Sequence, residues 1–174
     1  MRTYRPGPKR RANPTAPDQG SLEITVLAGP SGQLARQVRE ASEGCPMADQ
    51  VGFSDSATAY NFIGDIFHAY GAAFDITAYL HSDREGRTWQ VSASGAMRPD
   101  PEAGIDVLFE RPYQFVVLAE HGSTRRSAVG GAHHGMAARA IADMLLRGYG
   151  PEKPSKVLIY DATTGRTTPV SARF

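Results

Sequence analysis

The sequence predicts a single α+β domain in which an antiparallel β-sheet is packed by about three helices and preceded by an extended arm. Three observations lead to this prediction. The chain has 174 residues, of which 41% are hydrophobic and 21% are charged, which is typical of one soluble globular domain. Segments with an apolar residue at every second position alternate with segments of helical period. The first 19 residues contain almost no apolar side chains, so they cannot build a core of their own.

Residues 1–19 are predicted to form a basic, proline-rich arm that is disordered or extended, and residues 20–174 form the domain. Of the 19 basic and 18 acidic side chains, the arm holds five and one, which leaves 14 basic and 17 acidic side chains for the domain. Four prolines lie among or after the basic side chains of the arm, which are Arg2, Arg5, Lys9, Arg10 and Arg11. Such an arm can be a solvated chain end, a strap that binds a neighbouring subunit, or a phosphate-binding tail. Only Tyr4 could stack on a base, which argues against sequence-specific recognition of RNA.

Composition also limits the compartment. A single cysteine, Cys45, excludes an internal disulfide and is compatible with a reducing environment. The basic N-terminus is not followed by an apolar stretch, as a secretory signal would require. No apolar run approaches the length of a membrane span. We therefore expect no contact with a membrane.

The stretch VLAGPSGQLARQ, residues 26–37, has the outline of a phosphate-binding loop, because a short strand runs into glycines and a helix is expected to follow. A nucleotide-binding loop also needs a second glycine, a lysine and a hydroxyl at fixed positions. Counted from Gly29, these positions hold Leu34, Ala35 and Arg36. We interpret the stretch as a turn with a helix start, and we expect no cofactor.

The first half of the domain is predicted to consist of one strand followed by two helices. Residues 21–27 alternate between apolar and polar, which predicts a half-buried strand. A short helix is expected over Gln33–Glu43, and a loop follows it. Residues 56–74 have the clearest helical period, and Asp55 or Ser56 can cap this helix. Its apolar stripe, interpreted as core, consists of Tyr60, Ile63, Phe67, Tyr70 and Phe74.

Two glycines interrupt this long helix. Gly64 and Gly71 each lower helix stability by about 1 kcal/mol relative to alanine. We interpret them as positions that allow the helix to pack closely on a sheet.

The next segments predict strands. Residues 76–80 and 89–93 alternate on either side of a polar turn, which predicts a hairpin. A polar break at residues 98–101 is followed by two further apolar segments, residues 105–109 and 113–120. We expect these four strands to form an antiparallel meander.

The last third is predicted as loop, helix and hairpin. Residues 122–131 are rich in glycine, serine and arginine and are expected to form a loop. The third helix is expected over His134–Arg147, with Gly148 ending it. Its buried face consists of Ala137, Ala140, Ile141, Met144 and Leu145. Strands near residues 156–160 and 167–172 predict a C-terminal hairpin.

Polar residues around this predicted loop are the candidate site. His133 and His134 begin the third helix, and Glu120 and His121 end the preceding strand. They could ligate a metal ion, but the chain lacks a spaced ligand pair such as H-x-x-x-H. His121 with Ser123 and an acid such as Asp106 could form a hydrolytic triad, but no G-x-S-x-G elbow is present.

The pair Arg125 and Arg126 lies in the predicted loop. Arginine binds anions and acidic protein surfaces well, so this pair could bind either. The alternative is a solvated loop.

Residues 111–145, RPYQFVVLAEHGSTRRSAVGGAHHGMAARAIADML, resemble the C-terminal half of the tail-completion or neck (head–tail joining) proteins of long-tailed phages. In that family a strand ends in an acid–aromatic–Gly–Thr/Ser element, followed by a variable loop and a closing helix. Tyr113, Glu120, Gly122 and Ser123 take these places here, with His121 in place of the aromatic residue. In that family an apolar segment precedes the last helix, and in this chain the sequence GGAHHGM stands in its place.

The resemblance implies a structural subunit of a virion, without an active site or cofactor, that acts in a homo-oligomeric ring at the head–tail junction and assembles in the host cytoplasm. The arm would contact a neighbouring virion protein or, without sequence specificity, the DNA. Further contacts are expected from Glu120, His121, Arg125, Arg126, His133 and His134.

Two alternatives stay open. One is a cytoplasmic accessory protein that binds nucleic acid or the ribosome through the arm. The other is a small metal-dependent or hydrolytic enzyme built around His121, His133 and His134.

Overall fold

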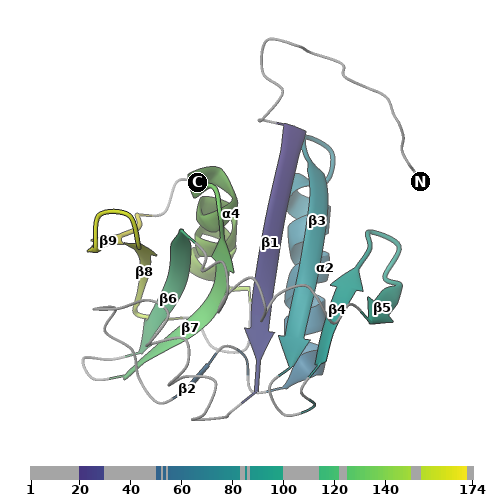
Figure 1. The fold of residues 1–174 in the computed structure, drawn as a ribbon, viewed down its shortest axis with the longest axis horizontal. Coiled ribbons are helices and arrows are strands. Elements are labelled where there is room, and N and C mark those ends of the chain that lie inside the picture. The colour runs from purple at the N-terminus through teal and green to yellow at the C-terminus, as the bar shows by residue number, and fades with distance from the viewer. Residues whose placement is uncertain are drawn as a thin grey trace.

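The structure is a computed structural model, and it describes residues 20–29, 50–51, 53, 55–82, 85, 87–99, 114–121, 125–149 and 154–171. Within these residues, one mixed β-sheet carries two helices on the same face (Figure 1). The elements in chain order are β1 (Ser21–Ala28), β2 (Gln50–Val51), α2 (Ser56–Tyr70), β3 (Asp75–Ser82), β4 (Arg87–Val91), β5 (Met97–Pro99), β6 (Phe115–His121), β7 (Arg125–Ala132), α4 (Gly135–Leu146), β8 (Lys156–Asp161) and β9 (Arg166–Pro169). The α+β class predicted from the sequence is confirmed.

The sheet order is β5-β4-β3-β1-β7-β6-β8-β9, and β2 pairs with β7. β1 and β3 are parallel over their whole length, from Ser21 opposite Asp75 to Ala28 opposite Ser82. The prediction of a purely antiparallel sheet is therefore wrong. The physical reason is that α2 connects the two strands, and a crossover helix returns the chain to the end of the sheet from which it started.

The expected meander is only partly present. β3 and β4 form the predicted antiparallel hairpin, and β5 extends it, with Trp89 opposite Pro99. β6 does not join these strands, because it lies between β7 and β8 in the other half of the sheet. The C-terminal hairpin of β8 and β9 is confirmed, with Asp161 opposite Arg166.

The segment predicted as a loop over residues 122–131 is mostly strand, because β7 spans Arg125–Ala132. β7 pairs with β6 along its length and with β1 at Gly130 and Gly131. A Cβ atom on Gly130 would collide with the backbone carbonyl oxygen of Thr25 and would lie 3.4 Å from Cδ1 of Ile141 on α4. Gly130 therefore allows β7 to pair with β1 while it packs against α4, and this glycine does not mark a flexible connection.

The core lies between the sheet and the two helices. The buried face of α2 is Ala59, Phe62, Ile63 and Ile66, which is shifted from the predicted stripe. Tyr60, Phe67 and Tyr70 are only partly buried, and Phe74 lies beyond the end of the helix. The predicted buried face of α4 is confirmed.

The number of helices differs from the prediction. The described part of the chain contains two helices, and about three were expected. The predicted helix over residues 33–43 and the predicted strand over residues 105–109 lie outside the described residues, as does the arm, residues 1–19. In the part of the chain that the structure describes, neither helix has the length and apolar character needed to span a membrane.

Candidate functional site

The start of α2 determines which residues of this helix are directed toward the sheet and which line a groove beside the helix. Asp55 is the N-cap, and its Oδ1 atom accepts hydrogen bonds from the backbone nitrogen of Thr58 at 2.7 Å and from the hydroxyl of Thr58 at 2.9 Å. This cap satisfies a backbone donor that has no partner within the helix. It therefore fixes where the helix starts and which residues face the sheet.

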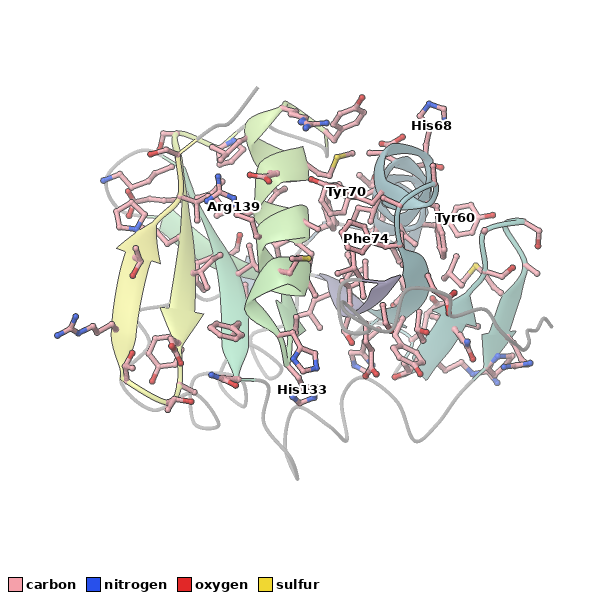
Figure 2. The ribbon with its side chains drawn as sticks, turned by 90° about the horizontal axis from the view of Figure 1, so that it is seen from above. Tyr60, His68, Tyr70, Phe74, His133 and Arg139 are labelled. Atoms are coloured by element: carbon pink, nitrogen blue, oxygen red, sulfur yellow. The ribbon has the colours of Figure 1, made fainter. Side chains whose placement is uncertain are left out.

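A groove of about 320 Å³ lies between α2 and the end of β4. We call it the α2–β4 groove. Its lining is Tyr60, Asn61, Gly64, Asp65 and Phe67 from α2, with Val91, Ser92, Ala93 and Gly95 from β4 and the turn that follows it. Figure 2 shows Tyr60 on the side of α2 that faces β4 and β5, whereas Tyr70 and Phe74 lie between α2 and α4.

The turn between β4 and β5 is tied to α2 through Tyr60. The Tyr60 hydroxyl donates a hydrogen bond of 2.6 Å to the carbonyl oxygen of Gly95. Gly95 has a φ of 94°, a conformation that favours glycine, and a Cβ atom there would lie 2.7 Å from the Tyr60 hydroxyl. The nitrogen of Ser92 also donates to the carbonyl oxygen of Ala96 at 3.0 Å. These bonds hold the rim of the groove in one position.

Gly64 leaves the floor of the groove open. It lies within α2, is exposed, and a Cβ atom placed on it would have no neighbouring atom within 4 Å. The prediction that Gly64 allows close packing on the sheet is therefore wrong. The glycine costs helix stability, and no contact within the described structure requires it.

The groove combines apolar walls with a few polar groups. Tyr60 and Phe67 are partly buried and pack against the core. Asp65 is partly buried, Asn61 is exposed, and the Ser92 hydroxyl lies 2.9 Å from that of Ser94. Asp65 is the single charged group among the lining residues. This arrangement suits a ligand with an apolar part and a positive charge.

The polar residues predicted from the sequence do not lie at this groove. Glu120 is opposite Arg126 on β7 and Lys156 on β8, and His121 is opposite Arg125. These residues share one end of the sheet. In the register of the sheet, Glu120 therefore has a basic residue opposite it on each neighbouring strand.

His133 and His134 lie at the opposite end of the β6–β7 hairpin. They follow Ala132, which is opposite Phe115, and six strand steps separate Phe115 from His121, which corresponds to about 20 Å. A metal ion is bound at about 2 Å from each histidine nitrogen, so one ion cannot join the two ends. Within the described residues, no group of three potential metal-ligating side chains is present.

His134 occupies the N-cap position of α4 but makes no side-chain capping bond. His134 is exposed and His133 is partly buried. In Figure 2, His133 lies at the start of α4, far from Tyr60. Asp106 and Ser123 of the hypothetical triad, and the five basic residues of the arm, lie outside the described residues.

A second group of polar contacts is made by Arg139 of α4. Nε of Arg139 is 2.8 Å from Oδ1 of Asp143, and a terminal nitrogen of Arg139 donates to the carbonyl oxygen of Ser171 at 2.7 Å. Partial burial raises the pKa of the Tyr70 phenol above its usual value of 10.0, and Asp143 adds to this increase, whereas Arg147 and Arg139 oppose it. The two contacts of Arg139 join α4 to the segment after β9.

Comparisons with known proteins do not add a family. The chain matches no protein-family model, no curated protein and no solved structure.

Sequence reasoning did not find the α2–β4 groove. Its aromatic side chains, Tyr60 and Phe67, pack against the core and also line the groove, and helical spacing predicts only the first of these two roles. The available signal was Gly64, a costly residue in the middle of a strongly periodic helix. Only the structure shows that this residue faces outward.

Proposed function

We propose that the protein is a structural subunit of a homo-oligomeric assembly in which the arm of one copy binds the domain of the next. The observation that carries this proposal is the separation of charge along the chain. Residues 1–19 have an excess of four positive charges, and the remaining residues have an excess of three negative charges. Opposite charges on two parts of one chain favour association between copies and guide its orientation.

The two outer strands of the sheet favour assembly of a limited number of copies over indefinite pairing of one sheet with the next. Among the described strands, β5 and β9 are the outer ones. Both are short, and each contains an arginine and a proline, namely Arg98 and Pro99 in β5 and Arg166 and Pro169 in β9. Charges and prolines on edge strands oppose indefinite pairing of sheets. Contacts made by an arm do not depend on these edges.

The resemblance of residues 111–145 to phage neck proteins supports a specific form of this proposal, a ring at the head–tail junction of a virion. Cyclic assembly closes when each copy contacts the next through the same pair of surfaces. An arm that binds a neighbouring domain is such a head-to-tail contact. In this form the protein would assemble in the host cytoplasm and become part of the virion.

A competing function is binding of nucleic acid by the same arm. The five basic side chains of residues 1–19 favour phosphate contacts. Such binding does not require a second copy of the chain. Binding of the arm to a neighbouring domain therefore predicts that the purified protein is oligomeric without nucleic acid, whereas binding of the arm to nucleic acid does not.

Size-exclusion chromatography with multi-angle light scattering, applied to the full chain after nuclease treatment, tests the proposal. We expect defined oligomers without absorbance from nucleic acid. The matched variant carries Arg5→Gln, Lys9→Gln, Arg10→Gln and Arg11→Gln in the full chain, and we expect it to be monomeric with unchanged circular dichroism. If wild type and variant have the same oligomeric state, or if oligomers form only with nucleic acid present, the proposal is wrong.

A further inference from the structure

We propose that the α2–β4 groove is the receptor for the proline-rich part of the arm, residues 4–11, supplied by a neighbouring copy of the chain. This inference rests on the proposed function, because it names the surface to which the arm binds. It commits to one occupant, on the basis of the groove's shape, its charge and the length of the arm.

The shape of the groove suits a proline-rich segment. Such segments favour the polyproline II helix and bind to grooves lined by aromatic side chains. Tyr60 and Phe67 are seven residues apart on α2, which places them about 10.5 Å apart along the helix axis. One polyproline II turn of three residues advances about 9 Å. A single turn of the arm therefore spans the floor between the two aromatic side chains.

Gly64 provides the space for this contact. It lies between Tyr60 and Phe67, and a Cβ atom there would meet no atom within 4 Å. A pyrrolidine ring is compact and carries no backbone donor, so it can rest on the exposed helix backbone at this glycine. The arm offers Pro6 and Pro8 for this position. The contact explains a glycine that weakens the helix without helping the domain to pack.

The charges of the two partners are complementary. Asp65 is the one charged residue in the lining of the groove, and it is acidic. Basic residues lie on both sides of the two prolines, with Arg5 before them and Lys9 after them. A guanidinium can form two hydrogen bonds to a carboxylate, which sets the direction in which a peptide lies. A proline over Gly64 therefore has a basic neighbour within reach of Asp65.

The arm is long enough to reach the groove of another copy. The described chain begins at Gly20, directly before β1. Ile24 of β1 is opposite Ala78 of β3, and Ala78 is opposite Val91 of β4, which lines the groove. Two strand spacings, or about 10 Å, separate β1 from β4. Nineteen extended residues span up to about 60 Å, which is enough to reach the groove of an adjacent subunit.

Photo-crosslinking in the full chain tests this proposal. Tyr4→benzoylphenylalanine places the crosslinker in the arm, and equal amounts of ¹⁵N-labelled and unlabelled protein are mixed before irradiation. We expect mass spectrometry to find crosslinks from position 4 to peptides containing residues 60–67 or 91–95, with half of the crosslinked pairs of mixed isotope. Crosslinks to other surfaces, or crosslinks only within one isotope, would overturn the proposal.

Two substitutions with a matched control locate the contact. Gly64→Arg fills the groove and repels the arm, and Asp65→Asn removes the charge without changing the size of the side chain. We expect each to lower the crosslink yield, the first by at least about tenfold, equivalent to ~1.4 kcal/mol of binding. Ala69→Arg adds the same charge at an exposed position of α2 outside the groove lining and is expected to leave the yield unchanged.

The outcome separates the two proposals. If Gly64→Arg and Asp65→Asn leave the crosslinks intact, the groove is not the receptor. If these variants remain oligomeric while the chain with a neutralised arm does not, the groove assignment is wrong and the proposed function stands. If neutralising the arm has no effect on oligomers, the proposed function fails, whatever the groove variants show.

Discussion

Replacing Gly130 by alanine should destabilise the protein more than any change of one methyl group on its surface. The added Cβ atom would collide with the backbone carbonyl oxygen of Thr25. That carbonyl belongs to β1, which is paired with β3 on one side and with β7 on the other. The obstacle is therefore part of the backbone of a central strand and cannot rotate away as a side chain would.

The expected cost follows from this geometry. Overpacking a well-packed interior usually costs about 1–3 kcal/mol. The new methyl group would also lie 3.4 Å from Cδ1 of Ile141, so α4 limits movement in the other direction. We therefore expect the upper end of the range, ~3 kcal/mol. For a chain of this length that corresponds to a decrease in Tm of about 6–12 °C.

Gly64→Ala is the matched control, since it is the same chemical change at a position with no neighbouring atom within 4 Å. Alanine is the better helix former, so we expect this variant to be more stable by about 0.5–1 kcal/mol. Urea unfolding followed by circular dichroism measures both variants, with the slope m used to confirm that the same surface is exposed. If Gly130→Ala unfolds within about 0.5 kcal/mol of the wild type, β7 does not pack against β1 in this register.

Two further predictions concern the helices. Asp55→Ala should lower the free energy of unfolding, measured in urea, by about 1 kcal/mol, because the N-cap bonds to Thr58 are lost. Asp55→Asn keeps a capping oxygen and should lose much less stability. Equal losses of stability in the two variants would contradict the role of the cap. The raised pKa of the Tyr70 phenol means that the folded protein holds this proton more tightly than the unfolded chain, so stability should be constant with respect to this group below pH 10 and should fall as the pH rises above it. Tyr70→Phe should remove the part of this loss of stability that comes from ionisation of the Tyr70 phenol. If Tm falls with the same slope from pH 8 to 11 in the wild type and in the variant, the raised pKa of Tyr70 does not contribute to stability.

Local patterns were sufficient for elements whose residues carry their own signal. The alternation over residues 21–27 predicted β1. The period of residues 56–74 predicted α2 with a cap at Asp55 or Ser56, and the structure has Asp55 in this position. The apolar face of α4 was also correct, because one side of the helix is rich in alanine and large apolar residues while the other is polar. In each case, the side chains along one segment determine which face is buried.

β7 shows why this reasoning has a limit. Its sequence, RRSAVGGA, has the glycines and polar residues of a loop. It becomes a strand because β6 and β1 both offer hydrogen-bonding partners, and because the Thr25 carbonyl and Ile141 leave no room for a side chain at Gly130. This need for a glycine comes from neighbours that are distant in the sequence. A preference for loops in isolation is therefore overruled by packing.

The sequence by itself determined the charge of the arm, the composition of one α+β domain and the positions of most helices and strands, because these depend on residues that are close together in the chain. The tertiary structure decided the parallel pairing of β1 with β3, the place of β6 between β7 and β8, and the separation of approximately 20 Å between His121 and the end of the hairpin that carries His133 and His134. It also decided that Tyr60 and Phe67, which pack against the core, line a groove together with Gly64. Helical spacing shows which residues share a face, but only the packing of α2 against the sheet determines which part of that face stays open.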